Sequence, residues 1–593
     1  MLEKKILTCD LCVVGGGIAG MSAAVAAARE GAKVVLMHER PVLGGNASSE
    51  IRMCISHARG DNNRETGLVE EIYLENLYRN PTKSFAIWDT VLYDFIRREE
   101  NITLLLNCTC MDAETETGAF SYGRDRKIRS VTGYQMTTQR FFEVRATYFC
   151  DSSGDSILAP LTGANFRLGR ESSEEFGEDT EVREADAMTM GMSCLIQGRQ
   201  TLEPIKYIPP VWSTPLTKEH FAHRNADPYR PDQNYWYLEL GGDRDTIGDT
   251  ETLRDELLEL AAGTWDFIKN SGEYDTETWD LDFLGFLPGK RESRRMCGEY
   301  MITQRDISDG RVFADEIAFG GWPLDDHFPG GFFHRGVPNT DVTTPAPYSI
   351  PYRSLYSNNV DNLFFAGRNI SMTHMAMSSI RIMGTCSLLG GAVGKAAAIA
   401  AGEGICPHDV YVKHMGRLQK LLMDSDHFLP SLLRPVSEDC KAAVLSGGEV
   451  LRNGQDRPHR IYGTDDTTAA YAAAPGEEIT YSFKSQKLSA VHIVFDSDLN
   501  RETLPGHRVD RQRCTRFSLR LDSPQMHMPD TLCKDFRLFG LRGGERIELL
   551  SVTDNRKRAW HIPVEQELDG LILVPQNTWG DWEKIPVISF DFT

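Results

Sequence analysis

The first forty residues predict a strand, a helix and a second strand from their hydrophobic pattern. Residues 10–14 form a short apolar run typical of a buried strand, and a glycine-rich stretch, 15–20, follows directly. Residues 21–29 are rich in alanine and predict a helix, and residues 33–37 (KVVLM) predict another buried strand. A helix between two such strands is typical of a βαβ unit with parallel strands.

Later segments predict that this unit belongs to a larger α/β fold. A helix is expected at residues 87–99, and strands are expected at 103–106, 146–150 and 363–366. Small apolar residues fill the stretch 384–401, which predicts one more buried helix. Strands separated by helices favour a doubly wound, Rossmann-like sheet.

The character of the chain changes twice, and each change predicts a domain boundary. The middle of the chain is rich in Trp, Tyr, Pro and charge, so we expect an inserted α+β substrate domain there. Near the C-terminus, short alternating strands separated by turns such as Pro475-Gly476 predict a β-sandwich. The predicted order is Rossmann-like domain (first part), insertion, Rossmann-like domain (second part), helical linker and β-sandwich, at residues 1–165, 166–345, 346–405, 406–446 and 447–593.

Composition narrows the classes of partner. The 593 residues carry a formal net charge of −21, which disfavours nucleic acid and anionic membrane as partners. No run of 18 apolar residues is present, so no membrane span is expected. The 13 cysteines are scattered and odd in number, which favours reduced thiols in a cytoplasmic protein. A signal peptide already removed from the N-terminus stays an open alternative.

The glycine loop has the spacing of a dinucleotide site. Gly15 permits a tight turn, Gly17 lets the backbone approach a pyrophosphate, and Gly20 lets the helix pack closely on the strand. Free N–H groups at the helix start would stabilise phosphate charge. Glu39 ends the second strand, where an acid accepts hydrogen bonds from a ribose. The alternative, a merely tight loop, explains neither the helix nor the acid.

Four blocks of sequence carry a resemblance to a known family. They are the glycine loop with Glu39, residues 41–48 (PVLGGNAS), residues 151–155 (DSSGD), and residues 362–368 (NLFFAGR) with the helix start near Gly384. Together they resemble the FAD-dependent oxidoreductase family related to the flavoproteins of succinate dehydrogenase and fumarate reductase. The blocks span residues 10–401, and each one alone is short.

The resemblance implies FAD as the cofactor. It implies binding by Gly15, Gly17, Ala19, Gly20, Glu39, Arg40, Gly44, Gly45, Asn46, Ser48, Arg52, Cys110, Ser153, Gly154, Asp155, Gly367, Arg368, Gly384 and Thr385. It also implies that the last helix points its N-terminus at the flavin, where the helix dipole would stabilise the reduced ring. Arg368 departs from the family pattern, because many flavoproteins carry an acid there to hold the ribityl chain.

Charged side chains near the expected flavin are the candidates for catalysis. They are His57, Arg59, His374, Arg381, Arg335 and Arg291. Histidine suits proton transfer near neutral pH, and arginine suits an anionic or developing oxyanion group. The alternative for each is a structural role, and a covalent flavin bond through Cys54 or His57 is a further alternative. No metal site stands out in the sequence.

These observations predict redox chemistry on a bound flavin. A small polar substrate, with a carbohydrate-derived compound as the leading choice, is expected between the flavin domain and the insertion. Hydride would pass between a substrate carbon and flavin N5. The second hypothesis is a flavin-holding scaffold that binds glycans or a partner. A monooxygenase ranks lower than a dehydrogenase or reductase because no NAD(P)H domain is visible, and no motif identifies the electron partner.

The predicted sandwich resembles galactose-binding-like domains. The resemblance rests on residues 491–499 and 577–581, and Trp579 and Trp582 are candidate glycan contacts. A docking or structural role is the alternative. Since all four FAD blocks end before residue 402, the sandwich should be removable after about residue 446, provided that the cut exposes no large apolar face.

Overall fold

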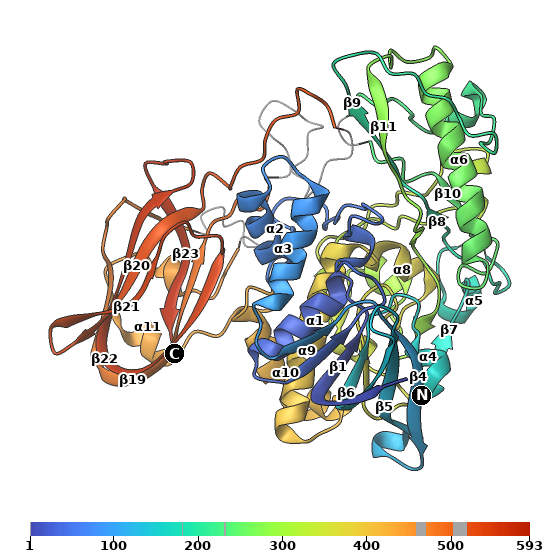
Figure 1. The fold of residues 1–593 in the computed structure, drawn as a ribbon. Coiled ribbons are helices and arrows are strands. Elements are labelled where there is room, and N and C mark those ends of the chain that lie inside the picture. Colours follow the sequence, from blue (N-terminus) through green and yellow to red (C-terminus); the bar gives the residue numbers. More distant parts are fainter. Residues whose placement is uncertain (1, 181, 231–232, 458–469, 502–518) are drawn as a thin grey trace.

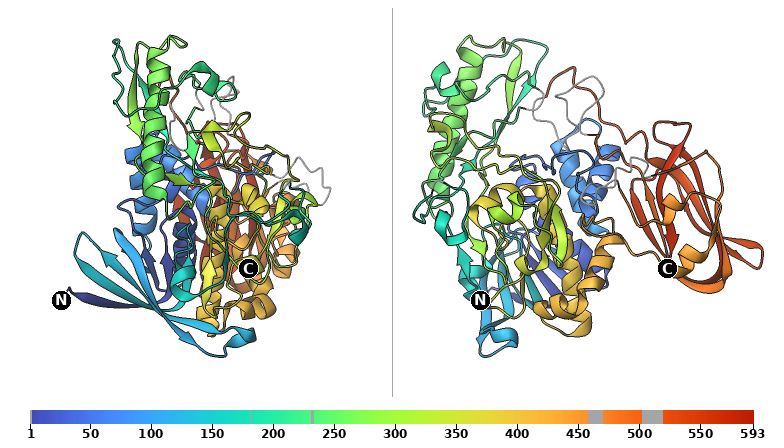
Figure 2. Two further views of the ribbon diagram at one scale, coloured as in Figure 1. Left: turned by 90° about the vertical axis from the view of Figure 1, so that its right-hand side faces the viewer. Right: turned by 180° about the vertical axis from the view of Figure 1, so that it is seen from behind.

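The computed structural model describes residues 2–180, 182–230, 233–457, 470–501 and 519–593. Figure 1 shows an α/β body at the centre, a lobe that contains α6 above it, and a β domain on the other side of helices α2 and α3. The two views in Figure 2 show the same three parts from the side and from behind.

The central sheet brings together strands from both ends of the predicted insertion. The order is β3-β2-β1-β6-β5-β4, and β16 also pairs with β6. All pairings among β1, β2, β3, β6 and β16 are parallel, whereas β4 and β5 run antiparallel. The bounds are β1 (Lys4–Val14), β2 (Val34–Met37), β3 (Ile102–Leu105), β4 (Cys108–Thr117), β5 (Arg126–Gln135), β6 (Arg140–Asp151) and β16 (Leu363–Phe365).

Two helices that are rich in small residues pack closely against each other beside this sheet. A Cβ added at Gly390 of α9 (Met383–Glu403) would lie 2.1 Å from the Ala19 carbonyl oxygen of α1 (Ile18–Arg29). Glycine is therefore required for the contact between the two helices. Helix α9 is long and apolar enough to cross a membrane by length and composition, but 89% of its apolar window is buried inside the protein. Its hydrophobic sequence is accounted for by this packing.

The middle of the chain forms the lobe and the segments that connect it to the sheet. Trp265 of α6 and Trp279 of β11 lie at the centre of a separate hydrophobic cluster in the lobe. The elements are α4 (Leu158–Thr162), β7 (Phe166–Arg167), α5 (Ser173–Phe176), β8 (Met192–Ser193), β9 (Ile196–Gln200), β10 (Glu239–Leu240), α6 (Thr250–Asn270), β11 (Trp279–Leu284), β12 (Gly289–Lys290), β13 (Arg295–Met296), α7 (Gln304–Ser308), β14 (Glu316–Gly320), β15 (Tyr348–Pro351) and α8 (His374–Ile380).

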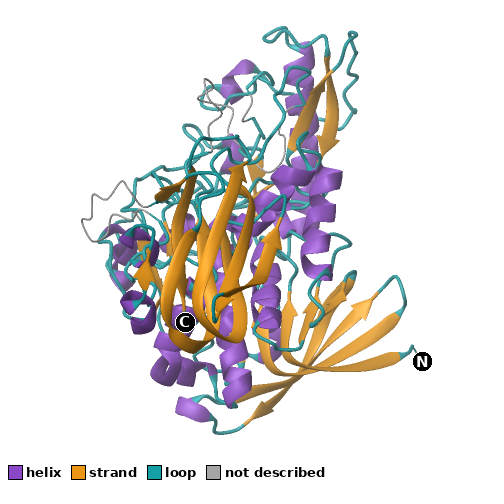
Figure 3. Ribbon diagram, turned by 90° about the vertical axis from the view of Figure 1, so that its left-hand side faces the viewer, coloured by secondary structure: helices purple, strands orange, loops and turns teal. Residues whose placement is uncertain are grey.

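The C-terminal domain is antiparallel β structure, as Figure 3 shows. Its strands pair in the order β18-β23-β19-β22-β20-β21, with β17 beside β19. Side chains from β19, β20, β22 and β23 share one hydrophobic core. After α10 (Pro407–Met423) and α11 (Glu438–Ala442), the strands are β17 (Val444–Leu445), β18 (Tyr471–Ala473), β19 (Ile479–Phe495), β20 (Cys533–Arg542), β21 (Glu545–Val552), β22 (Ala559–Thr578) and β23 (Ile585–Phe592). The galactose-binding-like assignment stays a prediction.

The C-terminal domain is attached to the α/β body through a buried interface. Leu74 and Leu77 of α2 (Leu68–Arg79), which precedes α3 (Phe85–Arg97), belong to the core of the C-terminal domain. Glu70 of the same helix is fully buried and pairs with Arg501 at 2.7 Å. A cut after residue 446 would expose these groups. Removal of the C-terminal domain was expected to be tolerated only if it exposed no large apolar face, and this requirement is not met.

The same interface involves one of the two predicted glycan-contacting tryptophans. The Trp579 ring packs edge-on against Tyr78 of α2 at 5.7 Å between centroids, and its indole N–H donates to the Asn555 carbonyl oxygen. Trp582 is 48% exposed. Of the two predicted contacts, Trp582 has the greater freedom to meet a glycan.

Candidate active site

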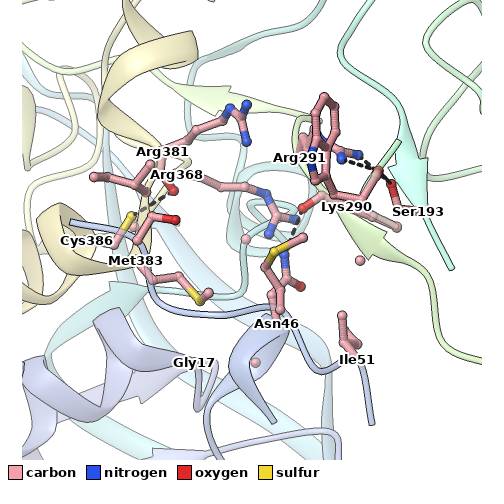
Figure 4. Close-up of a pocket in the computed structure, with 18 of the residues that line it drawn as sticks. Gly17, Asn46, Ile51, Ser193, Lys290, Arg291, Arg368, Arg381, Met383 and Cys386 are labelled. Atoms are coloured by element: carbon pink, nitrogen blue, oxygen red, sulfur yellow. Dashed lines mark hydrogen bonds between the residues drawn. The ribbon is translucent and has the colours of Figure 1, made fainter. Parts of the chain in front are cut away.

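One cavity of about 1160 Å³ lies at the carboxyl edge of the central sheet. On one side, its walls are the glycine loop after β1, the segment around Gly44, the segment after β6 and the segment after β16. The opposite wall comes from the lobe and includes Ser193, Lys290 and Arg291, which Figure 4 shows facing Arg368 and Arg381 across the pocket. The carboxyl edge of a parallel sheet is where such folds bind ligands.

The glycine loop has the geometry that its spacing predicts. Gly15 has φ +109°, and a Cβ there would lie 2.2 Å from the Ser152 carbonyl oxygen. A Cβ at Gly20 would lie 1.9 Å from the Gly15 carbonyl oxygen, so this glycine is required for helix packing. Among the described residues, the only atom that an added Cβ at Gly17 would meet within 4 Å is the Gly45 Cα, at 3.8 Å. Gly17 therefore borders open space, and it caps α1 without a side-chain hydrogen bond.

His38 fixes the loop against the next turn. The Gly16 N–H donates to His38 Nδ1 at 3.0 Å, so Nδ1 is the acceptor nitrogen. Nε2 lies 3.0 Å from the Val42 carbonyl oxygen, to which it donates. The imidazole thus joins the glycine loop to the turn before Gly44, and its Nδ1 also lies 3.2 Å from Glu39 Oε2. No feature of the sequence motif had singled out this residue.

Most of the predicted cofactor residues line this cavity. They are Gly15, Gly17, Ala19, Glu39, Arg40, Gly44, Gly45, Asn46, Ser153, Gly154, Asp155, Gly367 and Arg368. The remaining six, Gly20, Ser48, Arg52, Cys110, Gly384 and Thr385, are not among the lining residues. Cys110 lies in β4, where burial raises the pKa of its thiol to about 12, and Ser48 is fully buried.

Arg368, the departure from the family pattern, is paired with an acid supplied by another segment. Its guanidinium lies 3.0 Å from Asp155 Oδ1, and Lys290 Nζ lies 2.7 Å from Asp155 Oδ2. Burial would raise the pKa of Asp155, but Arg368 and Lys290 lower it. Arg368 Nε is buried and has no hydrogen-bond partner among the described residues, which leaves a donor at the cavity wall.

Arg52 joins the α/β body to the lobe instead of lining the cavity. Its guanidinium lies 4.6 Å from the ring centroid of Phe85 in α3 and 4.0 Å from that of Phe283 in β11. It also lies 3.4 Å from Asp282. Two aromatic faces and a carboxylate therefore hold this cation where the two parts meet.

Glu65 explains where His57, Gly384 and Thr385 lie. The Glu65 carboxylate is fully buried, lies 2.9 Å from His57 Nδ1, and accepts from the Thr385 hydroxyl at 2.8 Å. A Cβ at Gly384 would lie 2.8 Å from Glu65 Oε2, so glycine is needed at this approach. The three predicted residues meet around a buried acid beside the cavity, and none of them is part of its lining.

His374 is held as a cation away from the cavity lining. Its Nδ1 lies 2.8 Å from Glu292 Oε2, and its Nε2 lies 3.0 Å from Asp326 Oδ1. Burial would lower the pKa of His374, but Glu292 and Asp326 raise it to about 10. An imidazolium already protonated at neutral pH cannot accept a proton, so this geometry argues against a base role for His374.

Three of the predicted arginines line the cavity, and each is paired. Arg381 bonds both the backbone and the carboxylate oxygen of Asp325 at 3.0 Å, with its Nε unpartnered among the described residues. Arg291 lies 3.4 Å from Glu239. Arg59 lies 2.9 Å from Asp341 and is half exposed. The fourth, Arg335, is exposed and outside the lining.

His327 is a cavity residue that the sequence reasoning missed. Its Nδ1 lies 2.6 Å from Glu239 Oε2, and its Nε2 lies 3.5 Å from Asp325 Oδ1. Together with Arg291 and Arg381 these groups form a continuous series of polar contacts along the wall. Trp236 packs against His327, with 5.1 Å between ring centroids. The acidic run before His327 (322–327, WPLDDH) is the signal that could have indicated it.

Within the described residues, no group of three or more His, Cys, Asp and Glu side chains is arranged to hold a metal ion. The described cysteines are all free. The polar side chains that line the cavity are those of arginine, lysine, histidine, asparagine, serine and threonine, together with carboxylates.

A family model described as "FAD dependent oxidoreductase" matches residues 10–422 of the chain. A fumarate reductase (cytochrome) of Shewanella frigidimarina is 58% identical over 40 residues, which cover 7% of this chain and 7% of that protein. The chain therefore matches only a small part of this curated relative.

Two solved structures have low similarity to the chain. The quinol fumarate reductase of E. coli has a TM-score of 0.26 at 11% identity, over 71% of this chain and 75% of that one. A family 32 carbohydrate-binding module from Streptococcus pneumoniae has a TM-score of 0.16 at 14% identity, over 27% of this chain and 89% of that one. Both scores are below 0.5, so only the family match is taken further.

Proposed function

The chain belongs to the FAD dependent oxidoreductase family, and from this premise we propose that it binds FAD in the cavity and oxidises or reduces a small, neutral, polar substrate beside it. The observation that carries the proposal is the shape of the cavity. It is continuous from the glycine loop to a charged wall contributed by the lobe. A cofactor at one end would thus meet a substrate at the other.

The residues at the glycine-lined end fit a dinucleotide. Open space at Gly17 and the uncapped start of α1 suit a pyrophosphate, and Glu39 suits a ribose. Arg368 Nε offers a further buried donor. Ile382, Met383 and Cys386 at the start of α9 line the cavity, which suits the approach of a flavin ring to the helix N-terminus. Bound FAD would supply hydride acceptance or donation at N5.

The pairing of three arginines at the other end favours a neutral substrate. Arg291 is matched by Glu239, Arg381 by Asp325, and Arg59 by Asp341. At Arg291 and Arg381, binding an anion would require a carboxylate to compete with these partners at a largely buried site. Hydroxyl groups can instead share the paired donors and acceptors, and an indole can cover the apolar face of a sugar ring. Trp236, Trp322, Asn234 and Asn339 also line the wall, which supports a carbohydrate-derived substrate.

We further propose a dehydrogenase or reductase in preference to a monooxygenase. The only dinucleotide fingerprint seen in the sequence is accounted for by FAD, and no fingerprint for NAD(P)H accompanies it. The electron partner is proposed to be a separate molecule. Glycan contact through the C-terminal domain, if present, would involve the exposed Trp582.

Anaerobic bleaching of the flavin tests these proposals. Purified protein should be yellow and release FAD, and neutral sugars or polyols should reduce the flavin faster than dicarboxylates of similar size. Faster reduction by dicarboxylates would contradict the neutral substrate while leaving the oxidoreductase intact. Tight FAD binding without reduction or reoxidation by any small molecule would favour the scaffold function. FMN in place of FAD, or no flavin uptake, would contradict the cofactor.

A further inference from the structure

Segment 56–67 beside the cavity is held by an arginine from the C-terminal part of the chain. Arg457 Nη1 donates to the carbonyl oxygens of Asn62 at 3.1 Å and Arg64 at 2.7 Å, and its Nη2 donates to the Thr66 hydroxyl. The side chain is buried, with its guanidinium 4.3 Å from the Phe428 ring centroid. One planar group therefore holds the backbone before Glu65 and the Thr66 side chain after it.

Glu65 links segment 56–67 to the start of α9 through hydrogen bonds. Besides Thr385 and His57, its carboxylate accepts from the Ala58 N–H at 3.0 Å. The Gly384 N–H donates to the Ser56 carbonyl oxygen at 3.1 Å. Ser56 and Met383 themselves line the cavity. The contacts thus run without a gap from Arg457, through segment 56–67, to two cavity-lining positions.

Further contacts hold the chain where segment 56–67 ends and α2 begins. The Gly67 N–H lies 3.4 Å from Asp426 Oδ2, and Asp426 also pairs with Arg558, the residue just before β22. Glu70 accepts from Ser497 at 2.9 Å in addition to Arg501. These groups are buried, so segment 56–67 lies between the C-terminal domain and the start of α9.

We propose that Arg457 is a positioning residue for the redox site and that, through Glu65, it sets the start of α9 against the cavity. The C-terminal domain then helps to position the residues of the cofactor site. The statement that the positioned ligand is FAD rests on the proposed function, whereas the mechanical link from Arg457 to α9 does not.

Hydrogen–deuterium exchange and FAD titration on the full chain test the link. Arg457→Ala should raise exchange in both segments 56–67 and 383–390 and weaken FAD binding roughly 2- to 30-fold, the usual range for a coupled site. Arg457→Lys should recover part of both effects, because one ammonium cannot replace a planar group that reaches three acceptors. Arg452→Ala is the matched control, since Arg452 also donates to two carbonyl oxygens, of Cys440 and Ala443, but does not reach segment 56–67.

The outcomes separate the two proposals. Raised exchange confined to 62–67, with 383–390 and FAD affinity unchanged, would overturn the link. The link would also be overturned if Arg452→Ala raised exchange in 56–67 and 383–390 and weakened FAD binding as Arg457→Ala does. If Arg457→Ala does not fold, Arg457→Lys decides by the same measurements. If the wild-type chain binds no FAD, the proposed cofactor fails, and exchange in 383–390 still decides whether Arg457 acts on α9.

Discussion

At the residue scale, two glycines of one motif have different roles. Gly20 is required by the fold, because a side chain there would meet the backbone of Gly15. Gly17 instead borders the cavity, where the nearest atom to an added Cβ is 3.8 Å away. A substitution at Gly17 therefore separates ligand binding from folding.

Gly17→Val should leave the protein folded and abolish FAD binding, because the side chain would occupy the space proposed for the pyrophosphate. FAD content after purification and the thermal unfolding midpoint give the two readouts. Gly402→Val is the control, since an added Cβ there meets nothing within 4 Å. Normal FAD content in Gly17→Val would mean that the cofactor does not lie against this loop.

Arg381→Ala should weaken substrate binding by roughly 10- to 100-fold, the worth of one hydrogen bond to a charged group. Arg381→Lys should recover little, because Arg381 bonds Asp325 through Nη2 while Nε remains available, and an ammonium cannot do both. Substrate dependence of flavin reduction measures the effect. Arg335→Ala, at an exposed position, should bind substrate normally. Unchanged binding in Arg381→Ala would remove Arg381 from the substrate site.

Sequence spacing located the cavity residues better than it assigned their roles. Loops that follow parallel strands meet at one edge, so the glycine loop, Asp155 and Arg368 could be placed from the chain alone. The roles of His57 and His374 depend on Glu65, Glu292 and Asp326. Two of those acids come from distant segments, and no local pattern records such pairings.

At the element scale, buried apolar strands were predicted, whereas elements rich in polar or charged residues were missed. The strands expected at 33–37 and 363–366 correspond closely to β2 and β16, since both are fully buried and apolar. The β4–β5 hairpin went unrecognised because β4 (CTCMDAETET) is mostly polar and partly exposed. Helix α2 was missed as well, since one of its buried residues is the charged Glu70, whose partner lies in the C-terminal domain.

The start of α8 gives the protein a pH-dependent stability. Below pH 6.5, the ordinary pKa of histidine, His374 is protonated whether folded or unfolded, so its pairs with Glu292 and Asp326 contribute fully. As pH rises toward about 10, the unfolded imidazole is neutral while the folded one stays charged, and the contribution is lost. The free energy of unfolding should fall over this range more steeply in wild type than in His374→Gln. If the free energy of unfolding, measured by urea denaturation, fell equally with pH in the two proteins, the result would contradict the pairing.

At the scale of the whole molecule, the C-terminal domain should not be removable. A chain ending at residue 446 would expose Leu74 and Leu77 to water and remove Arg501, the partner of Glu70. We expect this truncated chain to aggregate or to unfold at lower temperature with little FAD. Co-expression of residues 447–593 should restore part of its solubility. A stable, soluble truncated chain with full FAD content would contradict both the interface and its role.

The pairing of β16 with β6 has a consequence for how the protein is made. Strand β6 ends at residue 151, yet its partner β16 is not synthesised until residue 365. At roughly 5–20 residues per second, a ribosome needs about 10–40 s to cover that interval. During this time the nascent sheet has an unfilled edge, and the loop that ends in Arg368 does not yet exist. The part of the cavity wall that this loop supplies is therefore completed late in biosynthesis, and the open strand edge is exposed to unwanted pairing until β16 arrives.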